Sequence, residues 1–211
     1  MSTRFQVNVF VEPMITIEYL MRETDRILSR CGAIFDVPTQ VWLDDRDEVD
    51  SLEPQEVRSF DEAMQYLLGW PALGSVDYTL GPLSLDVGFS SFSSFSSGML
   101  QVWMAFNGDA FRQHPESLPE IVALVHALHD GLNAVRSSFG WGLTDSSNDE
   151  SEEAERLSLG VVVGTPWLDL LRRDLATQEH FEWLDARRGN QTTLERTTSG
   201  GLVWQRDEGP P

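Results

Sequence analysis

Residues 5–32 have the sequence FQVNVFVEPMITIEYLMRETDRILSRCG. From Phe5 to Val11 apolar side chains mostly alternate with polar ones, a period of two that predicts a half-buried β-strand, and Pro13 ends it. From Ile17 to Cys31 apolar residues recur every three or four positions, which predicts an amphipathic helix that ends at Gly32. A strand followed by such a helix predicts a sheet with helices packed on it.

Further segments of both kinds follow along the chain. Strands are predicted at 41–43, 83–89, 99–106 and 157–163, and a terminal hairpin at 192–198 and 202–206. Helices are predicted after Ser59 and Ser117, each with capping-box spacing, to about residues 68 and 139, and again at 167–176 and 179–187. Because strands and helices do not alternate regularly, we predict an α+β fold: a mixed, largely antiparallel sheet with three or four amphipathic helices packed on it. We expect a single acidic domain over residues 1–211.

Charge limits the classes of partner. The chain has 34 acidic and 15 basic residues and a net charge of -19, which disfavours binding to nucleic acid and to anionic membranes. Every basic residue is arginine, so mechanisms that need a lysine amine, such as Schiff-base catalysis and the P-loop, are excluded. The single cysteine, Cys31, cannot form an internal disulfide, and neither a secretory signal nor a membrane-spanning apolar run is present. We therefore expect a cytoplasmic protein.

Catalytic and metal motifs are missing from the sequence. His126 and His129 lie three residues apart with Asp130 beside them, a spacing that can hold zinc, but no third ligand pattern completes the site. Cys31 lies on the apolar face of its predicted helix, where a thiol is a core residue more often than a nucleophile. We therefore predict a protein that is not an enzyme and has no catalytic residue, metal or cofactor.

Two acidic runs stand out, and each follows a tryptophan. Residues 44–62 hold nine acids and two arginines, and residues 145–155 hold six acids and no base. Such runs are commonly solvated loops, but they can also steer a cationic partner to the surface. Exposed tryptophan is typical of interface hot spots, so Trp42 and Trp141 are the expected anchors. The predicted partner-binding residues are Trp42, Asp44, Asp45, Asp47, Glu48, Asp50, Trp141, Asp145, Asp149, Glu150, Glu152 and Glu153.

The last third of the chain resembles a family of bacterial immunity proteins. The similar segments are the predicted strand 157–163, the helix entry Gly164-Thr-Pro-Trp-Leu-Asp-Leu-Leu171 and the strand Gly200-Gly-Leu-Val-Trp-Gln205. These resemble the type VI secretion and polymorphic-toxin immunity proteins, in particular immunity protein family fifty-two or a relative. The resemblance implies a protein that neutralises a cognate basic toxin, a nuclease-type effector, by covering its cationic substrate-binding surface.

Two other functions stay open at this point. The chain could be a self-associating structural or scaffold subunit, a homodimer whose acidic loops only keep it soluble. It could also be an enzyme without a recognisable motif, built on a histidine (His114, His126 or His129) or on a carboxylate pair such as Asp86 and Asp109.

Overall fold

The structure is a computed structural model of the chain. It describes residues 4–43, 54–69, 74–91, 99–141, 167–174, 178, 182, 192–196 and 201–206. The described strands are β1 (Arg4–Val11), β2 (Ile34–Phe35), β3 (Thr39–Leu43), β4 (Gln55–Val57), β5 (Gly74–Leu80), β6 (Leu83–Ser91), β7 (Leu100–Asn107), β8 (Arg136–Trp141), β9 (Leu168–Leu171), β10 (Thr192–Arg196) and β11 (Leu202–Arg206). The described helices are α1 (Ile17–Arg30), α2 (Phe60–Leu68), α3 (Gly108–Gln113), the 3-10 turn η1 (Pro115–Ser117) and α4 (Leu118–Gly131).

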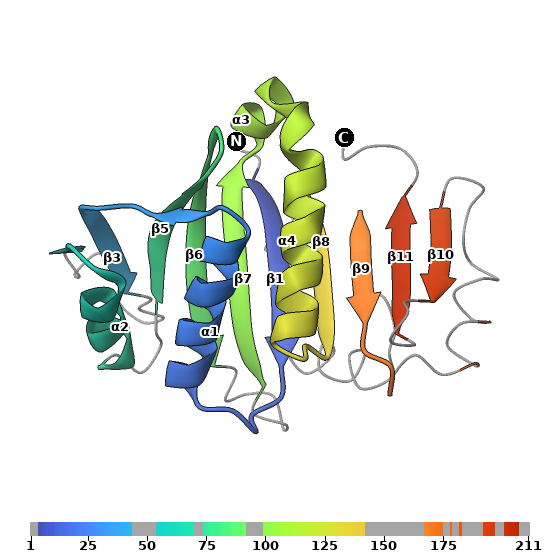
Figure 1. Cartoon of the computed structure of the whole chain (residues 1–211), viewed down its shortest axis with the longest axis horizontal. Coiled ribbons are helices and arrows are strands. Elements are labelled where there is room, and N and C mark those ends of the chain that lie inside the picture. The colour runs from blue at the N-terminus through green and yellow to red at the C-terminus, as the bar shows by residue number, and fades with distance from the viewer. Residues whose placement is uncertain are drawn as a thin grey trace.

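All described strands belong to one sheet, and every pairing between them is antiparallel. Their order is β10-β11-β9-β8-β1-β7-β6-β5-β3-β4, with β2 also paired to β5. The first strand of the chain therefore lies at the centre of the sheet, between β7 and β8 (Figure 1). The predicted α+β class is confirmed, as is the terminal hairpin, in which β10 pairs with β11.

The helices cover one face of the sheet. In Figure 1, α1 and α4 lie in front of the central strands, and α2 lies near β3. Contacts from the sheet identify this face: the Tyr78 hydroxyl donates to Asp25 of α1 (2.8 Å), and Ser137 of β8 contacts His129 of α4 (3.0 Å). Residues opposite one another on neighbouring strands point to the same face. Every second position of the central strands therefore points away from the helices. We name that side the open face because no described helix covers it, although its central side chains are buried.

Two of the predicted helices form for the reasons that the sequence indicates. The Thr16 hydroxyl accepts the N–H of Tyr19 at the start of α1, and Gly32, with φ +88°, follows its end. Ser59 caps α2 by accepting the N–H of Glu62, and the Glu62 carboxylate accepts the N–H of Arg58. The helix predicted to begin after Ser117 does form, but Ser117 makes no side-chain cap and η1 precedes it.

The long helix predicted to residue 139 is shorter than expected. α4 ends at Gly131, and Asn133 has φ 49°, a left-handed conformation that turns the chain. The N–H of Val135 then donates to the carbonyl of Phe10, and β8 continues along β1. The apolar spacing of Val135 and Phe139 suited a helical stripe, but Val135 directly precedes β8 and Phe139 lies within it, opposite Val7.

The helix predicted at 167–176 is also wrong, since Leu168–Leu171 forms β9 between β8 and β11. All four residues of β9 are buried, so this strand has no alternation of apolar and polar residues. The strands β2, β4 and β5 and the short helix α3 were not predicted. The predicted strand at 157–163 lies outside the described residues, as does most of the segment 179–187, of which residue 182 is helical.

Candidate protein-binding surface

The predicted contact residues fall in three places. Trp42 lies on β3, near the end of the sheet, and half of its side chain is exposed (50%). Trp141 is the last residue of β8, with its backbone opposite Phe5. Five strand steps separate β3 from β8, or about 24 Å, so these two tryptophans do not form one contact. The ten predicted acidic contacts lie outside the described residues.

A row of residues across the open face begins at Trp42. Trp42 is opposite Ser75 on β5, Ser75 is opposite Gly88 on β6, and Gly88 is opposite Trp103 on β7. Trp103 is partly exposed, whereas Ser75 and Gly88 are buried. Two tryptophans with accessible surface therefore flank two small residues in a single row.

Trp103 lies against the backbone of Gly88. A Cβ at Gly88 would be 2.0 Å from Cε2 of the indole, much closer than any side chain can approach. Glycine at residue 88 is therefore what allows the indole to approach β6 this closely.

Two aspartates occupy the next row of the open face. Asp77 on β5 is directly opposite Asp86 on β6, and both are partly buried. The Thr39 hydroxyl donates to Asp77 (3.1 Å), and the Thr79 hydroxyl donates to Asp36 (2.8 Å). Burial raises the pKa of Asp77, and the nearby Asp36 carboxylate raises it further against the opposing hydrogen bond from Thr39. We name Trp42, Trp103, Asp77 and Asp86 the tryptophan–aspartate patch.

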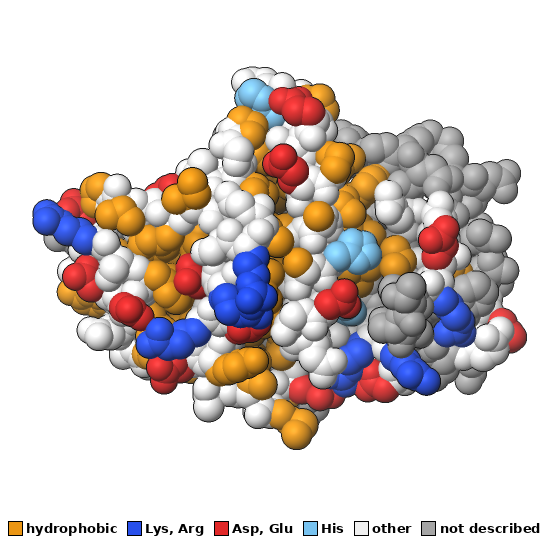
Figure 2. Space-filling model, in the orientation of Figure 1, with side chains coloured by type: hydrophobic (Ala, Val, Ile, Leu, Met, Phe, Trp, Pro, Cys, Tyr) orange, Lys and Arg blue, Asp and Glu red, His pale blue; other side chains and the backbone are white. Residues whose placement is uncertain are grey.

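On the helix face the charges compensate one another. Arg22 contacts Glu18 (3.2 Å) and Asp61 (2.9 Å), while Arg26 pairs with Glu23 and Arg112 with Asp109. Figure 2 shows basic and acidic side chains interspersed on this side of the molecule. By contrast, no described arginine forms an ion pair with Asp36 or Asp77.

The central part of the open face is polar and buried. Gln6 and Gln101 both donate to the Asn8 side chain (3.0 and 2.9 Å), and each of the three is at most 7% exposed. Farther along, Arg136 donates to Asp169 (2.8 Å), and both side chains are almost fully buried. β1 is therefore buried on both faces rather than half-buried as predicted.

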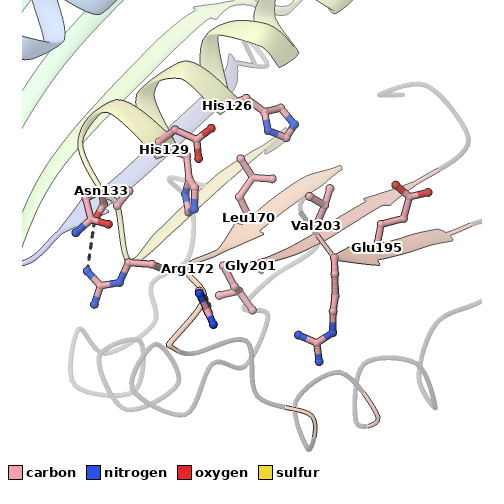
Figure 3. Close-up of a pocket in the computed structure, with 13 residues that line it drawn as sticks. His126, His129, Asn133, Leu170, Arg172, Glu195, Gly201 and Val203 are labelled. Carbon is pink, nitrogen blue, oxygen red and sulfur yellow. Dashed lines mark hydrogen bonds between the residues drawn. The ribbon is translucent and has the colours of Figure 1, made fainter. Parts of the chain in front are cut away.

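A groove of about 700 Å³ lies on the helix face, between the end of α4 and strands β9 and β11 (Figure 3). Its floor includes Leu170 and Val203, and its charged lining contains both signs: Asp130, Arg172, Arg173, Glu195 and Arg196. Arg172 is held by Asp174 (2.7 Å), by Glu12 (2.8 Å) and by the Asn133 carbonyl (3.3 Å). These hydrogen bonds, first to Asp174 and then to Glu12, raise the pKa of Arg172.

The two histidines of the groove do not make a metal site. His129 lies beside Ser137, and burial lowers the pKa of His129 to about 4, assisted by His126 and Arg172 against the opposing charge of Asp130. Among the described residues no three His, Cys, Asp or Glu side chains are grouped so as to hold a metal ion. The alternative carboxylate pair is not formed either, since Asp86 faces Asp77 and Ala105, whereas Asp109 pairs with Arg112 in α3.

Comparisons with known proteins find a similar fold among solved structures. No protein-family model matches the chain, and no curated protein sequence matches it. Among solved structures, the Pseudomonas aeruginosa T6SS protein PA0821 is similar, with a TM-score of 0.50 at 15% sequence identity. The match covers 96% of this chain but 65% of that protein, so the chain spans less than two thirds of its length. Within the described residues, no helix is long and apolar enough to cross a membrane.

Proposed function

We propose that this protein is a binding module and not an enzyme: a cytoplasmic immunity protein that binds a cognate basic toxin and covers its substrate-binding surface. The observation that carries this proposal is the position of Trp42. It is half exposed on a strand near the end of the sheet, two residues before the start of the acidic run 44–62, in a chain of net charge -19. An exposed tryptophan beside concentrated negative charge is suited to binding a cationic protein.

A nuclease is the class of toxin that best fits this surface. Its substrate is a polyanion, so its active site must present positive charge to phosphates. An acidic protein that docks there excludes the nucleic acid, gains association rate from complementary potential, and needs no cofactor.

The similarity in fold to a T6SS protein supports the part of this proposal that links the chain to type VI secretion. Type VI secretion was the setting implied by the resemblance in the last third of the sequence, which is independent of the structural comparison. Membership of a particular immunity family and the nuclease activity of the partner are both part of the proposal.

Affinity capture and co-expression test the function. The tagged protein is used to capture partners from lysate of its native cells at about 50 and 500 mM salt, where surface charge interactions differ strongly in screening. A captured basic protein is then expressed in a bacterial host with and without this chain. We expect growth arrest by the partner alone and rescue by co-expression. A partner whose toxicity this chain leaves unchanged would contradict the immunity function.

Self-association is the competing function, because Ile34, Val37 and Trp42 expose apolar surface near the same end of the sheet (67%, 60% and 50%). Light scattering of the purified chain separates the two. A monomer that becomes a heterodimer with the toxin fits the immunity function, and a stable homodimer through these residues fits a scaffold subunit.

A further inference from the structure

We propose that Ile34, Val37 and Trp42 form the surface on which the basic partner docks, and that the partner brings apolar side chains together with arginine or lysine to it. We name these three residues the β2–β3 surface. This inference rests on the proposed function and extends the contact from a single tryptophan to a surface. Three observations support it: the exposure of the three side chains, their placement along β5, and the charge around them.

Exposed apolar side chains are concentrated in this part of the chain. Seven large apolar side chains are exposed in the part of the chain that the structure describes, and three of them lie within residues 34–42. Ile34, Val37 and Trp42 are 67%, 60% and 50% exposed, whereas the central side chains of the open face are buried. Single exposed apolar residues are common on any protein, but a group of them is typical of a protein-binding surface.

The strand β5 places two of these residues on one face, at the end of the sheet where β3 lies in Figure 1. β6 pairs with one edge of β5 along its whole length, so β2 and β3 both pair with the other edge. Ile34 is opposite Thr79, and Trp42 is opposite Ser75. Ile34 and Trp42 therefore lie about 13 Å apart on the open face, and Val37 lies in the connection between β2 and β3. One partner of ordinary interface size, about 800 Å² on each side, can cover both.

The charge around the surface selects a cationic partner. Asp36 lies between Ile34 and Val37 in the chain, its carboxylate accepts the uncharged Thr79 hydroxyl, and no described arginine pairs with it. The acidic run 44–62, which begins two residues after Trp42, holds nine acids and two arginines. Burial of apolar side chains supplies affinity, and complementary charge around them favours one class of partner over others. A basic protein that also exposes apolar side chains fits both features.

A second copy of the chain fits the surface less well. Symmetric pairing would bring both copies of the run 44–62 to one interface, between chains that each have a net charge of -19. Like charges that meet across an interface oppose association, whereas a cationic partner is attracted to the same surface.

Three short synthetic peptides test the surface without the natural partner: one that contains arginine and leucine, one in which serine replaces leucine, and one in which glutamate replaces arginine. Each is titrated into the full chain at low salt. Binding is followed by the methyl signals of Ile34 and Val37 and the indole N–H signal of Trp42 in NMR spectra. We expect all three signals to shift with the arginine–leucine peptide. The serine peptide should bind about tenfold more weakly and the glutamate peptide should not bind, because each lacks one of the two features.

Matched variants show whether binding depends on these residues. I34T/V37T removes apolar surface but keeps the branched side chains that favour strands. Met14→Thr is the control, because Met14 is 89% exposed and lies between β1 and α1, outside the β2–β3 surface. We expect I34T/V37T to weaken binding of the arginine–leucine peptide by about tenfold and Met14→Thr to leave it unchanged. Thermal unfolding shows whether each variant is folded, and Val37→Thr alone is used where the double variant is unstable.

The inference would be overturned by failure of the arginine–leucine peptide to bind, by equal binding of the serine or glutamate peptide, or by equal effects of I34T/V37T and Met14→Thr. A dimer of the free chain that I34T/V37T dissociates, seen by light scattering, would assign the surface to a second copy and overturn it as well.

Rescue from the toxin tests the proposed function separately. A chain carrying I34T/V37T that binds the toxin as tightly as the unaltered chain would keep the immunity function and lose this surface. An unaltered chain that binds the arginine–leucine peptide through the surface but rescues no toxin would keep the surface and lose the immunity function.

Discussion

Gly88 and Trp103 lie directly opposite each other on β6 and β7, and the indole occupies the space where any larger residue at 88 would place its Cβ. The sheet therefore fixes the position of Trp103 through a residue that has no side chain. Since Trp103 is one of the two aromatic residues of the patch, a change at Gly88 is a test of the patch as well as of the fold.

Gly88→Ala should displace the indole. The new methyl group would overlap the ring, and overpacking of this kind costs about 1–3 kcal/mol. We expect a lower free energy of unfolding in urea and a changed tryptophan emission spectrum. Gly69→Ala is the control, because a Cβ there would lie 3.4 Å from the Tyr66 carbonyl oxygen, an ordinary contact distance. Unchanged stability and emission in Gly88→Ala would show that Trp103 does not lie on Gly88.

Neighbouring residues of β3 should respond differently to truncation. Val41 is fully buried, so Val41→Ala should cost about 2 kcal/mol of stability. Trp42 is half exposed, so Trp42→Ala should cost less than Val41→Ala while weakening the complex with the toxin by more than about tenfold. Urea unfolding and calorimetric titration measure the two effects. A Trp42→Ala variant that binds the toxin as the unaltered protein does would remove this residue from the interface.

An element can be predicted from the sequence when the residues that determine it lie within its own segment. The helices α1 and α2 carry caps and periodicity within their own residues, and both were predicted. β8 and β9 depend on partners far away in the chain: Phe139 is opposite Val7 and Leu168, and these contacts outweigh the helical spacing of the local sequence.

The residues of the candidate site were likewise predicted only in part. Trp42 was predicted as a contact anchor. It is half exposed in the structure, and its contact with a partner stays a prediction. Trp103 and Asp77 were missed, since nothing in their own segments indicates that register places them beside Trp42 and Asp86. These two residues could have been found only by predicting that β5 pairs with β6 and with β3. The strand β5 itself was not predicted.

Removing one partner of the buried ion pair Arg136–Asp169 should lower the free energy of unfolding more than replacing both partners with apolar residues. Asp169→Asn removes the charge that Asp169 places beside the buried guanidinium, and loss of one partner of such a pair costs about 3–5 kcal/mol. The double variant Arg136→Met with Asp169→Leu should be more stable than Asp169→Asn, because it removes both charges. Urea unfolding of the three proteins tests this order, which would be refuted by a double variant less stable than the single one.

Stability should fall in mild acid because of His129. Its pKa is about 4 in the folded protein and about 6.5 in the unfolded chain, so the unfolded state binds the proton first as the pH falls. The resulting loss develops between about pH 6.5 and pH 4 and reaches about 3 kcal/mol. The His129→Leu protein should not show this loss of stability in mild acid. Urea unfolding at several pH values compares the two proteins, and parallel pH profiles would contradict a buried neutral His129.

The acidic runs should control how fast the partner binds. Reversing the charge of Asp44, Asp45 and Asp47 to arginine should slow association with the toxin at low salt, with little change in dissociation. The same exchange at Asp149, Glu150 and Glu152 tests the second run. Stopped-flow measurements at low and high salt provide the rates, and a run whose reversal leaves the low-salt rate unchanged is not part of the binding surface.

The most direct test of the central claim is capture of partners from native lysate with two baits, the unaltered chain and Trp42→Ala, each at low and high salt and analysed by mass spectrometry. We predict that the unaltered chain enriches one basic, nuclease-like protein at low salt, that high salt weakens the capture, and that Trp42→Ala reduces it. Enrichment of no basic protein by the unaltered chain at either salt concentration would contradict the claim that this acidic protein acts by binding a cationic toxin.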